Sequence, residues 1–201
     1  MNSFISEDNI EQAICNRLSG PEYGWECIEC DPSVQAQDDV SKTGRSNPTE
    51  CILPEVFFNA FQRINPQIDP ETLKGIVRDF RKDYTGTDMV DTNYKFYNQI
   101  RNGIKVKTRN QHREDFDIVK LIDFDNVDNN SFHCVNQMWI KGHFRYRRPD
   151  VLLFVNGLPV VFIELKNSTV KVEESYNKNL VSYRKDIPNI FALNQICVLS
   201  N

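Results

Sequence analysis

Two apolar runs separated by two residues constrain the fold of this 201-residue chain more than any other feature. Residues 151–155 and 158–163 are unbroken and rich in β-branched side chains, which is typical of strands covered on both faces. The Asn156-Gly157 pair between them tolerates the positive φ of a tight reversal. The sequence therefore predicts a hairpin at the centre of a sheet, with its two outer ends close together.

Charged residues stand at the outer end of this hairpin. Asp150 precedes the first run, and Glu164 and Lys166 close the second. On a strand Glu164 and Lys166 leave the same face, whereas Leu165 points into the core. Two carboxylates and the Leu165 carbonyl offer hard oxygen ligands for Mg²⁺, with Mn²⁺ as a substitute. Lys166 would orient a water or stabilise charge on a phosphate, so the group suits phosphodiester hydrolysis.

The spacing D-x₁₃-E-x-K is a weak signal on its own. A plainer alternative, favoured without context, makes Asp150 a turn residue and Glu164 and Lys166 an exposed pair at a strand end. The pairing register separates the two interpretations. A plain two-residue turn places Asp150 opposite Ile163, on the face away from Glu164. One metal site requires a shift of one residue, through a three-residue loop or a β-bulge.

Context comes from a resemblance that covers most of the chain from about residue 103 to 201. Residues 148–150, 154–159 and 164–167 resemble the PD-(D/E)xK nuclease site of the restriction (R) subunit of type I restriction-modification enzymes, as do residues 121–124, 136–137 and 186–188. The resemblance implies an α/β, restriction-endonuclease-like core with a mixed central β-sheet flanked by helices. It implies a helical N-terminal part over about residues 1–102 and a catalytic sheet core over about 103–201, together one nuclease domain. Asp150 and Glu164 would be metal ligands and, with Lys166, catalytic.

Supporting site residues follow from the same family. A Gln-x-x-x-Tyr element follows its catalytic strand on a helix, and the matching positions here are Asn179 and Tyr183, a shorter amide and a retained tyrosine. Glu11 lies beside the apolar stripe of a helix predicted over residues 6–18, with Ser6 as N-cap. Related nucleases bring a helical glutamate towards the metal, although an exposed glutamate is the favoured interpretation. We retain Glu11, Asn179 and Tyr183 as supporting residues.

Hydrophobic periodicity and capping residues indicate the other elements. We expect helices from Pro54, from Asp69-Pro70, over about 92–102 and over 172–183, strands over 23–30, 104–108, 116–124, 132–140 and 195–199, and a loop over 31–47.

Two basic clusters flank the predicted site in sequence, although the net charge of −4 argues weakly against a general polyanion binder. Phosphate contacts from such groups would hold a duplex over the metal without reading its sequence. The alternative is strand-edge protection by Lys and Arg. DNA contact is favoured for the second cluster, which runs into Asp150. The first cluster is Arg101, Lys105, Lys107, Arg109 and Arg113, and the second is Lys141, Arg145, Arg147 and Arg148.

Cysteine usage and the N-terminus bear on the compartment. The first ten residues contain no signal peptide, and no apolar run approaches the ~20 residues of a membrane helix. We expect a cytoplasmic protein without membrane contact, whose six cysteines are reduced thiols. Cys27 and Cys30 form a single CxxC, and packed thiols are favoured over zinc because no second pair exists.

With these features, the resemblance implies the Mg²⁺-dependent endonuclease domain of a type I R subunit, cutting double-stranded DNA without local sequence choice. In the family that subunit also carries an ATP-driven translocase and joins methylation and specificity subunits. No G-x-x-x-x-G-K-[ST] occurs in this chain, so ATP would act through a motor region outside it, and we expect a fragment of a larger chain. A stand-alone repair nuclease or resolvase and a catalytically silent module that docks DNA or partner subunits are the alternatives.

Overall fold

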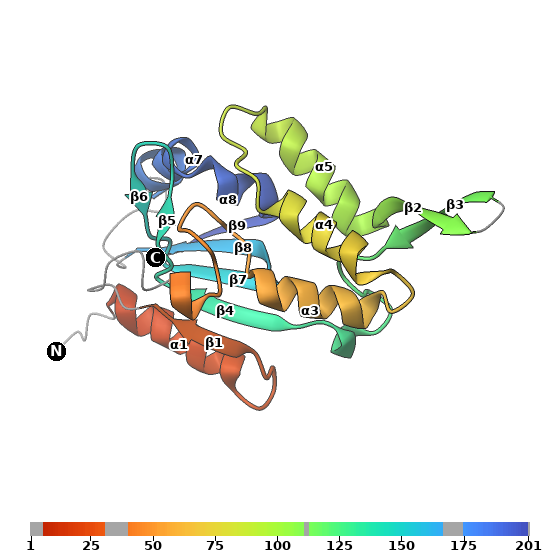
Figure 1. Cartoon of the computed structure of the whole chain (residues 1–201). Helices are drawn as coiled ribbons and strands as arrows, with labels where there is room; N and C mark the ends of the chain where they lie inside the picture. Colours follow the sequence, from red (N-terminus) through yellow and green to blue (C-terminus); the bar gives the residue numbers. More distant parts are fainter. Residues whose placement is uncertain (1–5, 31–39, 111–112, 167–174, 201) are drawn as a thin grey trace.

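A five-stranded mixed sheet forms the centre of the molecule (Figure 1). The computed structural model describes residues 6–30, 40–110, 113–166 and 175–200. The central pairs β4–β7 and β7–β8 are antiparallel, whereas β1 and β9 join the sheet in parallel. The predicted α/β class with a mixed sheet is thus confirmed. In spatial order the strands are β1 (Glu26–Glu29), β4 (Phe132–Asn136), β7 (Val151–Val155), β8 (Leu158–Leu165) and β9 (Ile196–Ser200).

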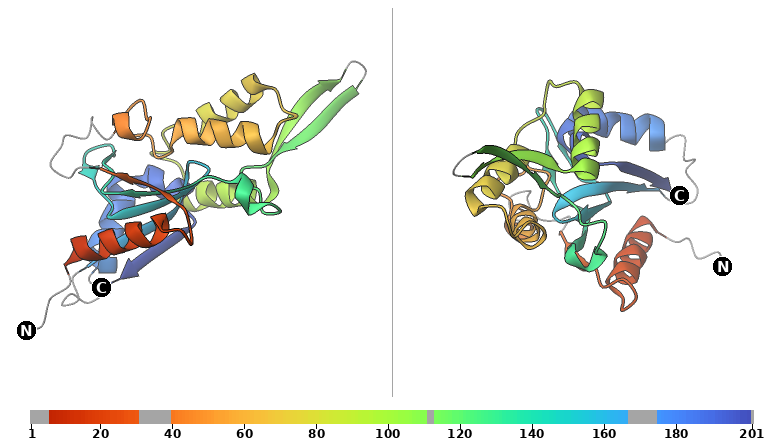
Figure 2. Two further views of the ribbon diagram at one scale, coloured as in Figure 1. Left: turned by 90° about the horizontal axis from the view of Figure 1, so that it is seen from below. Right: turned by 90° about the vertical axis from the view of Figure 1, so that its right-hand side faces the viewer.

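Both faces of this sheet are covered, as the composition of the two central strands predicts (Figure 2). Helix α1 (Glu7–Ser19) packs on one face over a small core that includes Val151 and Ile163. Leu152 and Phe162 point the other way, into a larger core. The helices on that side are α3 (Pro54–Ile64), α4 (Pro70–Phe80), α5 (Met89–Asn102), α7 (Val181–Asp186) and α8 (Pro188–Leu193).

Capping residues set the helix starts. The Ser6 side chain accepts a hydrogen bond from the Asn9 N–H, which confirms the predicted N-cap of α1. Helix α5 begins at Met89, earlier than predicted, because the side chain of Asp88 accepts from the Asp91 N–H. Among the described residues no helix is long and apolar enough to cross a membrane.

Strands β2 (Ile104–Asn110) and β3 (Arg113–Val119) form a separate hairpin that projects from the body as an arm (Figure 1). The prediction of a strand over 116–124 is wrong at both ends, because β3 pairs with the whole of β2 and stops at Val119. The predicted strand over 132–140 is also broken. Gln137 has a φ of 56°, which ends β4, and Ile140–Lys141 (β5) pairs instead with Tyr146–Arg147 (β6).

The segments around the last strands differ in detail from the predictions. Residues 172–174 of the predicted helix lie outside the described part; Ser175–Leu180 form a π-helical turn that leads into α7. Part of the predicted loop, residues 31–39, is likewise not described. Strand β1 pairs with β4, so the first part of the chain contributes to the central sheet. The division at about residue 102 stays a prediction.

The connection between β7 and β8 is a tight two-residue turn. Asn156 and Gly157 have φ values of 52° and 76°, and Val155 faces Leu158 across the turn. A Cβ on Gly157 would lie 2.5 Å from the carbonyl oxygen of Leu53, so both the conformation and the close approach require glycine.

A β-bulge then changes the register of these two strands. The pairing shifts by one residue in the middle of the hairpin, so that Val151 faces Ile163. The next residues outward, Asp150 and Glu164, are therefore opposite each other and share a face. This is the bulge that a single site requires, and the register prediction is confirmed.

Candidate active site

Asp150 directly precedes β7 and lies beside the end of β8. Its Oδ2 accepts a hydrogen bond from the backbone N–H of Leu165 at 2.6 Å, which fixes the carboxylate against the neighbouring strand. Burial raises the pKa of Asp150 to about 7, and the negative charge of Glu164 adds to the rise. The two carboxylates are thus close enough to repel each other, and a shared cation would relieve that repulsion.

Glu164, the last but one residue of β8, is 1% exposed. Its Oε1 accepts hydrogen bonds from Lys166 Nζ at 2.9 Å and from Asn179 Nδ2 at 2.7 Å. Its Oε2 is buried and has no hydrogen-bond partner among the described residues. Because a buried carboxylate oxygen without a partner is costly, this atom can accept a cation or a hydrogen-bond donor at the end of the sheet.

Lys166 holds its ammonium group against the same end of the hairpin. Besides Glu164, its Nζ donates to the Leu165 carbonyl oxygen at 2.6 Å and lies 3.8 Å from Glu7 Oε2. Burial alone would lower the pKa of Lys166, but the hydrogen bond to Glu164 and the surrounding acidic charges raise it. The lysine is therefore a cation. The Leu165 carbonyl, expected as a metal ligand, here accepts from Lys166.

Asn179 and Tyr183 reach the site from the segment that follows β8. The amide of Asn179 is bonded to Glu164, so the shorter side chain at the family's glutamine position still reaches the carboxylate. The hydroxyl of Tyr183 donates to the Arg148 carbonyl oxygen at 3.3 Å, and its ring packs on Phe162. Tyr183 thus supports the wall of the site through backbone and ring contacts.

Helix α1 brings Glu11 to the same place. Glu11 is 5% exposed, and its Oε1 accepts from Gln137 Nε2 at 2.6 Å. The favoured expectation of an exposed glutamate is wrong, because the sheet end and Gln137 cover it. Burial raises the pKa of Glu11, although the hydrogen bond from Gln137 opposes that rise.

Sequence reasoning gave Gln137 no role, yet two contacts tie it to the site. Its backbone N–H donates to the Asp150 carbonyl oxygen at 2.9 Å, and its side chain binds Glu11. It does so in a left-handed conformation, which is uncommon outside glycine and marks a constrained position. The available signal was the resemblance at residues 136–137, which carried no role for the glutamine side chain.

These side chains line one cavity of about 830 Å³ at the open end of the sheet. Its wall carries the unpartnered Glu164 oxygen, the Asp150 carboxylate with its raised pKa, and a lysine that holds its charge. Hard oxygen donors in this arrangement fit a divalent cation such as Mg²⁺. The predicted residues that line the cavity are Asp150, Glu164, Lys166, Asn179, Tyr183 and Glu11.

Comparison with known proteins identifies the family. A family profile described as "Type I restriction enzyme R protein N terminus" matches residues 4–201. The chain belongs to this family. It is 29% identical over 98% of its length to the type I restriction enzyme HindI endonuclease subunit of Haemophilus influenzae, and 31% identical over 78% to a putative type I restriction enzyme MjaIXP endonuclease subunit of Methanocaldococcus jannaschii. The chain spans 18% and 15% of those relatives' lengths.

Only part of the second basic cluster lines the cavity. Arg147 and Arg148 line the cavity. Arg147 is paired with Asp186 at 2.5 Å, and the Arg148 guanidinium lies 5.2 Å from the Trp139 ring centre. Lys141 and Arg145 belong to the neighbouring β5–β6 hairpin and are exposed, without lining the cavity.

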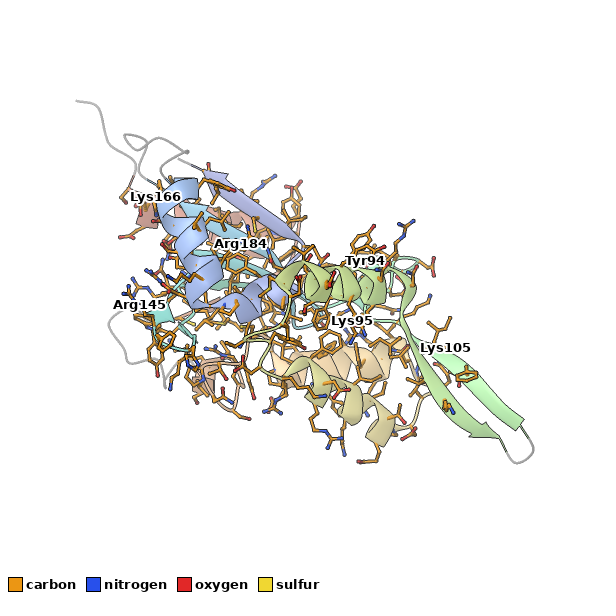
Figure 3. All side chains as sticks on the ribbon, turned by 90° about the horizontal axis from the view of Figure 1, so that it is seen from above. Tyr94, Lys95, Lys105, Arg145, Lys166 and Arg184 are labelled. Carbon is orange, nitrogen blue, oxygen red and sulfur yellow. The ribbon has the colours of Figure 1, made fainter. Side chains whose placement is uncertain are left out.

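The first basic cluster lies elsewhere. Lys105 and Lys107 are exposed on the arm formed by β2 and β3, and the side chain of Arg109 is outside the described part. Figure 3 shows Lys105 at the opposite end of the molecule from Lys166, whereas Arg145 lies at the same end as Lys166. The fold therefore brings the second cluster towards the site and keeps the first away from it.

Proposed function

We propose that this chain is the Mg²⁺-dependent endonuclease domain of a type I restriction enzyme R subunit, which hydrolyses phosphodiester bonds of double-stranded DNA without local sequence choice. The observation that carries the proposal is the buried Glu164 Oε2, which has no partner among the described residues and shares a face with Asp150. The names of the relatives, all endonuclease subunits, agree with a nuclease role.

Each residue has a role in this proposal. Asp150 and Glu164 would hold the ion, and Mg²⁺ bound there would polarise the phosphate and lower the pKa of a bound water. The Leu165 N–H keeps the Asp150 carboxylate directed at the site, and Asn179 does the same for Glu164. Lys166, charged and anchored to Glu164, stabilises negative charge that develops on the phosphate oxygens.

Membership of the family supports the proposed substrate and partners. Double-stranded DNA is the substrate that would cross the cavity, with Arg148 and the β5–β6 hairpin beside it. Methylation and specificity subunits and an ATP-driven motor would act through the rest of a longer chain, because the relatives are more than five times as long as the matched part. A silent docking module has no reason to bury two repelling carboxylates, and a stand-alone repair nuclease fits the family match less well.

The test is plasmid nicking by the wild type and Lys166→Ala, with and without Mg²⁺, beside Mn²⁺ titration calorimetry. We expect slow, Mg²⁺-dependent nicking by the wild-type chain, because nothing delivers DNA to it. Lys166→Ala should lose at least about a hundredfold of this activity and keep Mn²⁺ binding, since its ammonium acts on the phosphate. Lys74→Ala, at an exposed lysine of α4, is the matched control. A wild type that binds no Mn²⁺, or an active Lys166→Ala, would overturn the proposal.

A further inference from the structure

Three cysteine sulfurs meet on the α1 face of the sheet, outside the catalytic cavity. Cys15 comes from α1, Cys27 from β1 and Cys134 from β4. The Sγ atoms of Cys15 and Cys134 are 3.5 Å apart, and all three sulfurs lie within 4.8 Å of one another. The six cysteines of the chain, all within the described residues, form no disulfide. We call the three residues the thiol cluster.

The thiol cluster contains only one cysteine of the CxxC pair seen in the sequence. Cys27 packs with the small core under α1, whereas Cys30 belongs to the large core on the opposite face. Side chains three positions apart in an extended segment leave opposite faces, so these two sulfurs cannot bind the same metal ion. The partners of Cys27 come from a helix before it and a strand far after it, which no local spacing reveals.

The dimensions of the thiol cluster suit a small cation bound by sulfur. Metal–sulfur bonds of about 2.3 Å in a tetrahedral site place neighbouring sulfurs roughly 3.8 Å apart. Within the described part of the chain no fourth His, Cys, Asp or Glu joins the group. Because Cys27 is only half-buried, a water can take the fourth position, as in sites with three protein ligands.

Metal binding by the thiol cluster requires the sulfurs as thiolates. A bound cation would displace the protons of the three thiols, since the thiolate is the metal-binding form. Cys27 donates to the Cys15 carbonyl oxygen at 3.3 Å, so its sulfur already faces the cluster.

We propose that Cys15, Cys27 and Cys134 bind one thiophilic cation of the Zn²⁺ class and thereby fasten α1 to β1 and β4. Soft thiolate ligands select such ions over Mg²⁺, so this site and the carboxylate site do not compete for one metal. Glu11 and Glu7 lie one and two helical turns before Cys15 on the same side of α1, and both line the catalytic cavity. The cation fixes the helix that presents these two glutamates.

The test is titration of the full 201-residue chain with Cd²⁺ in the presence of a phosphine reductant, followed by thiolate-to-metal absorption in the ultraviolet. We expect one equivalent of Cd²⁺ to bind and the midpoint of thermal unfolding to rise by roughly 5 to 10 °C at a hundredfold excess over the dissociation constant. Cys134→Ser should lose the absorption. Because Cys134 is fully buried, the half-buried Cys27→Ser serves as a second variant, with circular dichroism to establish folding.

Two other serine variants are the controls. Cys30→Ser removes the CxxC partner and Cys197→Ser removes the exposed thiol, and both should keep the absorption. The proposal fails if no thiolate absorption develops in the wild type, if a folded Cys27→Ser retains it, or if Cys30→Ser abolishes it. None of these measurements depends on the carboxylate site, so their outcome does not decide the proposed nuclease function, which has a separate test.

Discussion

Two lysine–glutamate pairs of the molecule have nearly the same bond and different surroundings. Lys166 Nζ lies 2.9 Å from Glu164 Oε1 at the end of the sheet, and Lys74 Nζ lies 2.8 Å from Glu71 Oε1 on α4. The Glu164 side chain is 2% exposed, whereas that of Glu71 is 81% exposed. The bond length therefore says little about what a pair does.

Burial makes the difference. Water screens the pair on α4, and exposed pairs of this kind contribute about 0 to 1 kcal/mol to stability. At the end of the sheet, burial of charge and repulsion between neighbouring carboxylates destabilise the folded state. One Glu164 oxygen also has no partner among the described residues. Catalytic sites commonly bury charged groups and place like charges together in a cavity, although this arrangement destabilises the fold.

The largest expected effect comes from the same substitution made in both pairs. Glu164→Gln should reduce Mg²⁺-dependent nicking by at least about a hundredfold and weaken Mn²⁺ binding, because it removes a charged ligand. Glu71→Gln should leave both quantities unchanged. Nicking rates, calorimetric affinities and circular dichroism of the two variants measure this. Equal activity of the two variants would show that burial does not give the Lys166–Glu164 pair a different role from the exposed pair.

The hairpin shows how far sequence reasoning reaches. Residues 151–163 predict buried strands by composition, and the requirement that Asp150 and Glu164 share a face predicts a one-residue shift. The structure supplies the shift as a bulge after a plain Asn156-Gly157 turn. Local chemistry fixed the turn, whereas the position of the bulge depends on packing against both cores, which the sequence does not display.

Contacts between segments far apart in the chain could not be predicted from the sequence. An exposed Glu11 was the favoured expectation because a helical wheel places it beside the apolar stripe but does not show what covers it. Gln137 covers it from the end of β4, and Cys15 meets Cys134 across a separation of 119 positions. The arm formed by β2 and β3 was predicted as strands, but its separation from the central sheet was not.

The next effect concerns stability and pH in the absence of metal. The pKa of Asp150 is about 7 in the folded state against an ordinary 3.8, so between these values the folded state holds more protons than the unfolded one. Stability therefore falls as pH rises through this window, and the cost is complete above pH 7. Asp150→Asn removes the cost and should raise the unfolding free energy at pH 8 by about 2 kcal/mol, allowing for partial exposure.

Urea unfolding in EDTA at pH 8 and near pH 4 measures the pH dependence of this gain. Most of the gain should be lost at the lower pH, because folded Asp150 is protonated there and the carboxyl of the unfolded chain, with its ordinary pKa of 3.8, has begun to take up its proton. Asp125→Asn is the matched control, because the Asp125 side chain is 85% exposed and pairs with Lys120 at the surface. If Asp150→Asn were no more stable than the wild type at pH 8, the cost of burying the Asp150 charge beside Glu164 would be absent.

The smallest expected effect compares exposed lysines at the two ends of the molecule. Lys141 lies 5.8 Å from the centre of the Tyr146 ring beside the site, and Lys105 lies 4.3 Å from the Phe116 ring on the arm. An exposed lysine that touches a phosphate contributes salt-dependent affinity, and its loss lowers the slope of log affinity against log salt by about 1. Lys141→Gln should show this loss with duplex DNA, whereas Lys105→Gln should not, because the arm lies at the opposite end from Lys166 (Figure 3). Fluorescence anisotropy over a range of salt concentrations gives both slopes. A lower salt slope for Lys105→Gln but not for Lys141→Gln would show that the duplex contacts the arm and not the end with the buried Lys166–Glu164 pair.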